Sequence, residues 1–239
     1  MNNRDNADRF IAIYNELDHY LRNLLHRREW VSFKELVITA SKFNRVVRKY
    51  REDLLQIADL RNILVHTFTG KTIAEPTDYT IEIANRIKEL IISPPTAMPR
   101  FWKKVITVES SERIKDVIKR MKQTNLSKFP VYDGNHFIGL LTAETIVRWL
   151  AFSTNIDETK VGEVILHAKH KDNYVFMPKN VNLFQIAEAF EIYHRNGKHL
   201  DAILITNSGK MDEAPIGIVT IYDLGEVYRA IEIRQIDKL

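Results

Sequence analysis

The 239-residue sequence contains no cysteine. This absence excludes disulfide bonds, thiolate zinc sites and cysteine nucleophiles, and it leaves histidine and carboxylate groups as candidates for polar chemistry. No apolar run approaches the roughly 20 residues that cross a bilayer, and the polar residues 1–5 have no signal-peptide core. We therefore expect a cytoplasmic protein with no membrane partner.

The sequence also has only a slight excess of positive charge. Lys and Arg number 35 against 31 for Asp and Glu, which gives a formal net charge of +4 and a pI of about 9.1. This mildly basic balance permits an anionic ligand such as a nucleotide or RNA without requiring one. Hydrophobic residues at 45% and charged residues at 28% are typical of a soluble, folded chain.

Proline is sparse, and three of its seven occurrences fall within residues 92–99, at Pro94, Pro95 and Pro99. Proline lacks a backbone donor and steers the preceding residue away from helix. We place a domain boundary here, which divides the chain into residues 1–95 and 96–239.

Before this boundary, apolar residues recur at the spacing of one face of a helix. Such stripes cover residues 10–25, 36–43, 54–64 and 81–91. Ser32 and Glu35 have capping-box spacing ahead of the second stripe, which continues to Phe43. The pattern predicts an all-α four-helix bundle over residues 1–95.

After the boundary the period changes and one pattern occurs twice. Phe137-Ile138-Gly139-Leu140-Leu141-Thr142 returns as Pro215-Ile216-Gly217-Ile218-Val219-Thr220. Each copy follows a predicted strand (105–108 or 174–177) and an amphipathic helix (114–121 or 183–190). We predict two β-α-β-β-α repeats, about 101–152 and 163–234, and hence an α+β chain.

The motifs of the two copies resemble those of the CBS domain. They are Phe129-Pro130-Val131-Tyr132-Asp133-Gly134, Gly139-Leu140-Leu141-Thr142 and Gly217-Ile218-Val219-Thr220-Ile221-Tyr222-Asp223-Leu224. CBS repeats pair into a compact unit, the Bateman module, with clefts in which many members bind AMP, ADP, ATP, a cyclic dinucleotide or S-adenosylmethionine. The resemblance implies a regulatory sensor of an adenine nucleotide that requires no other cofactor.

The strand-to-helix junction at Thr220 is the first candidate binding site. Such a junction presents free backbone N–H groups and a positive dipole end to a phosphate. Thr220 adds a hydroxyl, and Asp223 can accept both ribose hydroxyls, a role that the resemblance also implies. The alternative is structural, with Thr220 as helix N-cap and Asp223 as its charge partner.

The resemblance adds Thr142, Met177 and Ala202 to the ligand-binding residues. The first copy departs from the motif because Thr145 stands where the ribose-binding aspartate is expected, and Glu144 is rotated from that position by about 100°. The second copy lacks the proline that the first has at position 130, which leaves the position of the adenine open. We expect one nucleotide for each pair of repeats, at the second copy.

One motif stands out before the boundary. Arg61-Asn62-Ile63-Leu64-Val65-His66 resembles the Arg-Asn-x-x-x-His signature of HEPN domains, four-helix bundles that include metal-independent ribonucleases. The resemblance implies a homodimer, with His66 as acid or base, Arg61 as phosphate-stabilising cation and Asn62 as orienting group. Alternatively, Arg61 pairs with Asp59 or Glu52, Asn62 and His66 satisfy each other, and the helical domain only dimerises or recruits a partner. The sequence thus leaves a nucleotide-regulated ribonuclease acting on RNA as the alternative function.

Overall fold

The computed structural model describes residues 3–27, 31–65, 74–153, 155–169 and 173–233. The chain divides into two compact units. One consists of Met1–Pro95 together with Tyr228–Leu239, and the other of Thr96–Val227. The second division, at Val227, was not anticipated from the sequence.

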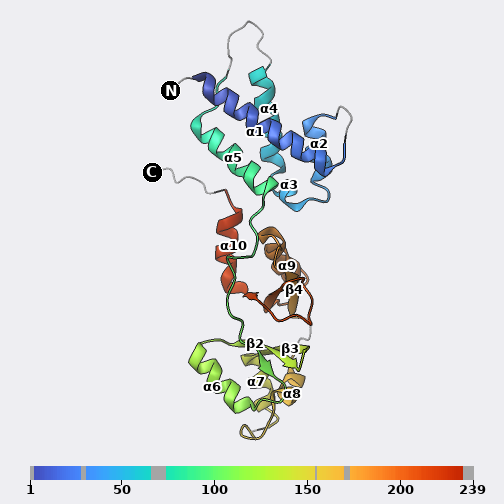
Figure 1. Cartoon of the computed structure of the whole chain (residues 1–239), viewed down its shortest axis with the longest axis vertical. Coiled ribbons are helices and arrows are strands. Elements are labelled where there is room, and N and C mark those ends of the chain that lie inside the picture. Colours follow the sequence, from blue (N-terminus) through green and yellow to red (C-terminus); the bar gives the residue numbers. More distant parts are fainter. Residues whose placement is uncertain (1–2, 28–30, 66–73, 154, 170–172, 234–239) are drawn as a thin grey trace. The chain divides into compact units, whose positions relative to one another are not determined.

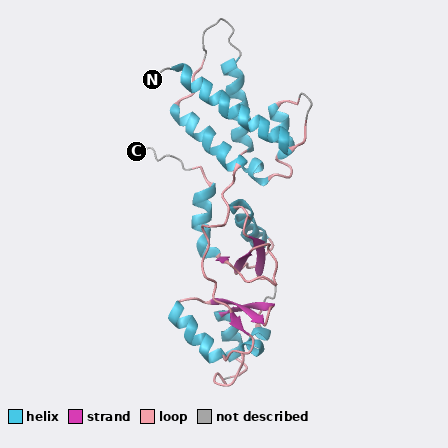
Figure 2. Ribbon diagram, viewed as in Figure 1, coloured by secondary structure: helices cyan, strands magenta, loops and turns pink. Residues whose placement is uncertain are grey.

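The first unit is helical (Figures 1 and 2). Its helices are α1 (Asn3–Leu24), α2 (Phe33–Ala40), α3 (Arg45–Lys49), α4 (Arg51–Val65) and α5 (Asp78–Ile92). Helix α1 packs against α5, α2 and α4. Its apolar stripe is buried at Phe10, Leu17 and Leu21. The four predicted helices correspond to α1, α2, α4 and α5, and the short α3 adds a fifth.

Side-chain caps fix where several of these helices begin. The Ser32 hydroxyl accepts a hydrogen bond from the Glu35 N–H (3.3 Å), and Asn44 caps α3 by accepting from the Val47 N–H (3.1 Å). The predicted extension of the α2 apolar face to Phe43 is wrong, because α2 ends at Ala40 and Phe43 is 60% exposed. The cap at Asn44 starts a new helix and turns Phe43 outward.

The second unit contains two three-stranded sheets, and its mixed α+β character is as predicted (Figure 2). The strands are β1 (Val108–Glu109), β2 (Lys128–Asp133), β3 (His136–Thr142), β4 (Tyr174–Pro178), β5 (Ala202–Thr206) and β6 (Gly217–Val219). In each sheet the first strand runs parallel to the second, and the second and third form an antiparallel hairpin. The repeat helices are α6 (Ile114–Thr124), α7 (Ala143–Leu150), α9 (Leu183–Arg195) and α10 (Leu224–Ile231). Short helices α8 (Val161–Val164), η1 (Ile165–His167) and η2 (Ile221–Asp223) complete the unit.

Strand register shows which residues occupy equivalent places in the two repeats. Val131 pairs with Gly139 as Ile205 pairs with Gly217, so Val131 and Ile205 are equivalent. Counting from these pairs makes Thr142 equivalent to Thr220, Thr145 to Asp223, Lys128 to Ala202 and Ser127 to Asp201. The parallel pairs Val108–Val131 and Met177–Ile205 make residues 104 and 105 equivalent to 173 and 174.

The strand predicted at residues 105–108 is wrong for most of its length, because β1 comprises only Val108–Glu109. The Tyr132 carbonyl accepts from the Ser110 N–H (2.7 Å), which identifies the β2 edge that faces β1. Pro130 lies two residues before Tyr132 on this edge and has no N–H to extend the ladder. Residues 103–107 are therefore outside the sheet. Within the described residues, every helix is too short or too polar to span a bilayer.

Candidate functional site

A cavity of about 230 Å³ lies in the second unit between segments of both repeats. The first repeat contributes residues 103–106 and 125–128, and the second contributes Ile218, Thr220, Tyr222 and Asp223. The strand-to-helix junction singled out from the sequence therefore opens onto a cavity. We call it the Asp223 cavity.

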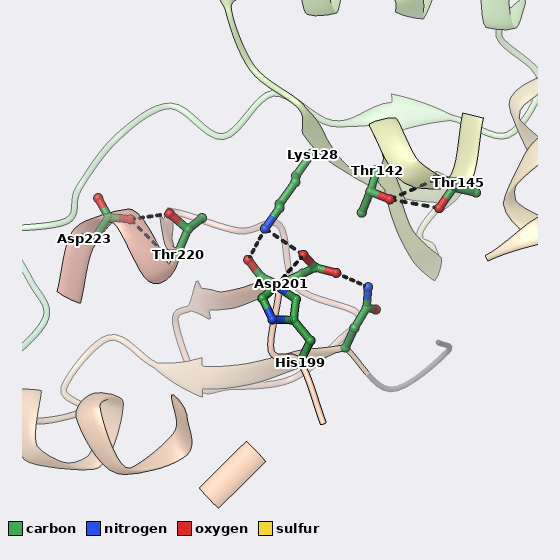
Figure 3. Close-up of polar contacts among 8 residues, drawn as sticks. Lys128, Thr142, Thr145, His199, Asp201, Thr220 and Asp223 are labelled. Carbon is green, nitrogen blue, oxygen red and sulfur yellow. Dashed lines mark hydrogen bonds and ion pairs between the residues drawn. The ribbon is translucent and has the colours of Figure 1, made fainter. Parts of the chain in front are cut away.

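Thr220 and Asp223 form a local hydrogen-bonded pair in this cavity (Figure 3). Asp223 Oδ2 accepts from the Thr220 backbone N–H (2.7 Å) and from its hydroxyl (2.9 Å). The Asp223 N–H in turn donates to the Thr220 carbonyl (2.9 Å). This is the capping arrangement that the structural alternative predicted, but it uses only one carboxylate oxygen. The other oxygen, Oδ1, lies 3.6 Å from Lys103 Nζ.

Three lysines line the Asp223 cavity, at positions 103, 104 and 128, against the single carboxylate of Asp223. Lys103 and Lys104 are exposed, whereas the Lys128 side chain is only 16% exposed. A cluster of cations in a partly enclosed site attracts anions more strongly than the same charges spread over a surface. The cavity therefore has the electrostatics of an anion site.

The segment that carries Lys103 and Lys104 is held in place by a close backbone approach at Gly217. Trp102 forms an antiparallel bridge with Gly217, outside the two sheets. A Cβ atom at Gly217 would lie 2.6 Å from the Phe101 carbonyl oxygen, a distance that real Cβ contacts do not reach. Only glycine therefore lets residues 101–106 run beside β6, which places both lysines at the cavity.

Apart from Asn125 and Ser127, the remaining wall of the Asp223 cavity is apolar. Val105, Ile106 and Ile218 are half-buried there, and the Tyr222 ring is 88% exposed at the rim. Ligand sites typically combine such apolar walls with a few convergent polar groups. The arrangement suits a ligand with one flat apolar part and one anionic part.

The equivalent junction in the first repeat has a different chemistry. Thr145, which replaces Asp223, donates its N–H to the Thr142 hydroxyl (3.1 Å), and the two hydroxyls lie 3.0 Å apart. Both threonines are buried, at 8% and 3% exposure for Thr142 and Thr145. This junction is capped like its counterpart, but it offers no carboxylate to a ligand.

Charge is also reversed beside this first-repeat junction. Ala202 stands in place of Lys128, and Asp201 in place of Ser127. The Asp201 carboxylate lies 2.7 Å from Lys128 Nζ, accepts from Asn173 Nδ2 (2.5 Å) and lies 3.5 Å from His199 Nε2 (Figure 3). Lys128 also donates to the Asp201 carbonyl (2.9 Å). The first-repeat junction therefore has a carboxylate beside it, whereas the equivalent part of the Asp223 cavity has a lysine.

Aromatic rings fill the neighbourhood of residue 174, the equivalent of Val105. The centroid of the Phe137 ring lies 4.8 Å from that of Tyr174 and 5.0 Å from that of Phe176. Tyr132 adds a fourth ring, 5.5 Å from Phe137. Edge-to-face contacts of this kind stabilise packing between the repeats. They place bulky rings where the Asp223 cavity has a smaller aliphatic side chain.

The ligand-binding residues predicted from the sequence do not all lie at one place in the structure. Thr220 and Asp223 line the Asp223 cavity, whereas Thr142, Met177 and Ala202 do not. Ala202 is fully buried in β5, and Met177 lies in β4. The sequence analysis missed the three lysines of the cavity, because only the pairing of the repeats brings residues 103, 104 and 128 together.

The HEPN-like motif lies at the end of α4. The Arg61 guanidinium carbon is 5.4 Å from the centre of the Tyr14 ring, and its buried Nε has no hydrogen-bond partner among the described residues. Asn62 is exposed. His66 lies outside the described residues, so its distance from Asn62 stays a prediction. Within the described ranges, no three His, Asp or Glu side chains are grouped to hold a metal ion.

A family model of the CBS domain matches residues 101–152, which contain the first repeat. An uncharacterized protein of Methanocaldococcus jannaschii is 37% identical over 76 residues, covering 32% of this chain and 26% of that protein. The match thus spans about a quarter of the relative's length.

Solved structures similar to this chain include CBS domains and CBS domain pairs. The CBS domain pair of protein MJ0100, in complex with 5′-methylthioadenosine and S-adenosyl-L-methionine, is 16% identical, with a TM-score of 0.44, over 58% of this chain and 99% of that one. The CBS domain of a bacterial CNNM/CorC family Mg²⁺ transporter, in complex with ATP, is 17% identical, with a TM-score of 0.42, over 64% of this chain and 97% of that one.

Proposed function

We propose that the chain is a regulatory adenine-nucleotide sensor that binds AMP, ADP, ATP or a related adenosyl ligand in the Asp223 cavity. One observation carries the proposal: the cavity brings a carboxylate, a hydroxyl, three lysines and an apolar wall together at the junction where the CBS motif predicts a nucleotide. The carboxylate suits the ribose hydroxyls, the lysines and the hydroxyl suit the phosphates, and the apolar wall suits the adenine.

The roles follow from the geometry. Asp223 Oδ1, the oxygen outside the cap, accepts hydrogen bonds from the ribose. Thr220, Lys103 and Lys104 lie on the same cavity and contact the phosphates, which prefer charge-assisted hydrogen bonds. The adenine packs on the aliphatic wall beside Ile218. The positive balance of the cavity favours a phosphorylated ligand over S-adenosylmethionine, whose sulfonium is cationic.

One ligand binds for each pair of repeats. The first-repeat junction has Thr145 in place of the ribose-binding carboxylate, and the Asp201 carboxylate lies close by and repels phosphate. At the position equivalent to Val105, the ring of Tyr174 packs against Phe137 and fills space that a second nucleotide would need. Each of these three differences disfavours a second nucleotide.

The sensor acts on the helical unit through α10. This helix follows Asp223 directly, and its residues from Tyr228 onward group with the helical unit. There the Tyr50 hydroxyl and Lys49 Nζ donate to the Ile231 carbonyl, and Arg86 donates to the Ala230 carbonyl (2.8 Å). A ligand that changes the conformation at the start of α10 therefore also shifts the conformation at its end, where Ala230 and Ile231 are hydrogen-bonded to the helical unit.

The protein acts in the cytoplasm as a homodimer. An apolar patch of Val147, Phe152 and Leu166, exposed by 66%, 79% and 72%, lies on α7 and the segments around η1 and supports such an interface. Phe152 stacks on His167 at 5.3 Å, which joins α7 to η1. Exposed apolar patches of this kind mark association surfaces.

Mass spectrometry of ligand retained on the purified protein, followed by calorimetric titration, tests the proposal. We expect an adenine nucleotide to bind with a stoichiometry near one for each chain. Two equal sites for each chain would contradict the assignment of a single cavity. Failure of AMP, ADP and ATP to bind, with no adenosyl compound retained, would refute the proposal as a whole.

The alternative function is a nucleotide-regulated, metal-independent ribonuclease that uses Arg61, Asn62 and His66. The observation that favours it is the exposed Asn62 at the end of α4, next to the partly exposed Arg61.

RNA cleavage measured in EDTA tests this alternative. The wild type should cut single-stranded RNA to 2′,3′-cyclic phosphate ends, and His66→Ala should lose roughly 10²–10⁴-fold in rate. Arg61→Ala should lose a similar factor while folding normally. If the wild type cuts no RNA with or without nucleotide, and Arg61→Ala unfolds at a lower temperature, then Arg61 serves to pack against Tyr14. The helical unit would then be a dimerisation or docking module.

A further inference from the structure

The helical unit contains a second cavity, of about 350 Å³, between α4 and α5. Its floor consists of apolar side chains that are at most 7% exposed: Phe10, Ile57, Ala84 and Ile87. Its α4 wall runs from Asp53 to Leu60, a separation of seven helical rises of about 1.5 Å each, so the groove is about 10 Å long. This size is within the roughly 300–1,000 Å³ range of small-molecule sites.

Asp53 is the one charged group that lines this groove in the described chain. Burial raises the pKa of the Asp53 carboxyl, a hydrogen bond with its own backbone N–H opposes the shift, and the like charge of Glu52 adds to it. Among the described residues, no lysine, arginine or histidine forms an ion pair with Asp53. The first turn of α4 stabilises an acidic side chain, and a cation bound in the groove would add the counter-ion that the described side chains do not supply.

The rest of the rim limits the chemistry of that ligand. Gln56, Tyr79 and Thr80 are neutral hydrogen-bonding groups, and Leu60 and Ile83 are aliphatic. None of the described residues that line the groove is a cation that could hold a phosphate or carboxylate. Its complement is a single positive charge attached to an apolar body.

We infer that the groove between α4 and α5 binds a small organic cation, an amine or guanidine on an apolar stem, with Asp53 as its counter-ion. The stem lies on the floor of Phe10, Ile57 and Ile87, and the charged end pairs with Asp53. This site is independent of the Asp223 cavity, with which it shares no residue. The full chain would then respond to two ligands of opposite charge.

Titration of the full chain with n-hexylamine tests the inference, with hexan-1-ol as neutral counterpart. Backbone amide NMR shifts should map to residues 53–60 and 79–87 for the amine, and the alcohol should bind roughly tenfold more weakly or worse. Asp53→Asn should weaken amine binding by a similar factor and leave alcohol binding unchanged. Glu52→Gln removes a neighbouring charge that does not line the groove, so it should weaken amine binding less than Asp53→Asn does.

Ile83→Trp provides a second test, because the larger ring covers the floor without altering Asp53. It should weaken both probes. Equal binding of amine and alcohol, wild-type binding by Asp53→Asn, or shifts outside α4 and α5 would each overturn the inference. A change from dimer to monomer in Ile83→Trp would also overturn it, because the groove would then be covered by a second copy of the chain.

Discussion

Replacement of Asp223 tests the proposed nucleotide site most directly. In Asp223→Asn the amide oxygen still accepts hydrogen bonds from the Thr220 N–H and hydroxyl, now 2.7 and 2.9 Å from the carboxylate. The variant therefore keeps the cap and loses the charge of the carboxylate. Asp223→Ala loses both, and the lost cap alone costs about 0.5–2 kcal/mol of folding stability.

The expected loss in affinity follows from the ribose contact. A hydrogen bond to a charged group contributes about 1.5–3 kcal/mol, so its loss weakens nucleotide binding by roughly tenfold to 150-fold. One effect opposes this loss: removal of the carboxylate leaves Lys103, 3.6 Å away, free to attract phosphate. Adenosine, which has no phosphate, should therefore lose more affinity than ATP in Asp223→Asn.

Isothermal titration calorimetry with adenosine, AMP and ATP measures these losses. Thr145→Ala is the matched control, because it removes part of the equivalent cap in the first repeat and Thr145 does not line the cavity. It should bind as the wild type does. If Asp223→Asn binds adenosine and ATP with wild-type affinity, Asp223 contributes only to the cap, and the assignment of the ribose to this residue is refuted.

Four further predictions follow from the contacts described above. Lys104→Ala should weaken ATP binding roughly fivefold and leave adenosine binding unchanged in the same titrations, because the lost charge acts on phosphate. Lys128→Met should lower the urea-unfolding free energy by about 3 kcal/mol, since it leaves a carboxylate that is 17% exposed without its cation; a loss below 1 kcal/mol would contradict this. Phe152→Glu should give a monomer in sedimentation velocity, whereas Met211→Glu in the 206–214 loop should not. Folding raises the pKa of Asp53 above its ordinary value of 3.8, so ionisation of Asp53 disfavours the folded state. The unfolding free energy of the wild type, relative to that of Asp53→Asn, should therefore fall as pH rises from 4 to 7.

Local patterns were sufficient to predict most elements of the fold. Apolar periodicity indicated four of the helices in the first 95 residues, and the repeated Gly-x-x-Thr sequence indicated the two hairpins. The errors occurred where one residue overrides the pattern. Pro130 shortens β1, although residues 105–108 are all β-branched and were predicted as a strand, and the cap at Asn44 turns Phe43 away from the core.

The candidate site was predicted only where its residues are close in sequence. Thr220 and Asp223 belong to one motif and lie in one cavity. The lysines at 103, 104 and 128 belong to no motif, and their proximity depends on the bridge of Trp102 to Gly217 and on the pairing of the repeats. Thr142 and Ala202 were grouped with Asp223 by family pattern, but register places them at the other junction.

Lys128 connects the two junctions, because it lines the Asp223 cavity and also pairs with Asp201. A phosphate in the cavity and the Asp201 carboxylate therefore share one cation. If a bound phosphate draws the Lys128 ammonium toward itself, the ion pair between Lys128 and Asp201 weakens. Because the two equilibria are linked, strengthening this ion pair must weaken phosphate binding by the same factor. Asp201 directly precedes β5, the central strand of the second sheet, so nucleotide occupancy would be linked to the contact between the repeats through the Lys128 side chain. Asp201→Asn, which releases Lys128, should consequently bind ATP more tightly than the wild type and adenosine equally well. Unchanged ATP affinity would show that Lys128 takes no part in phosphate binding.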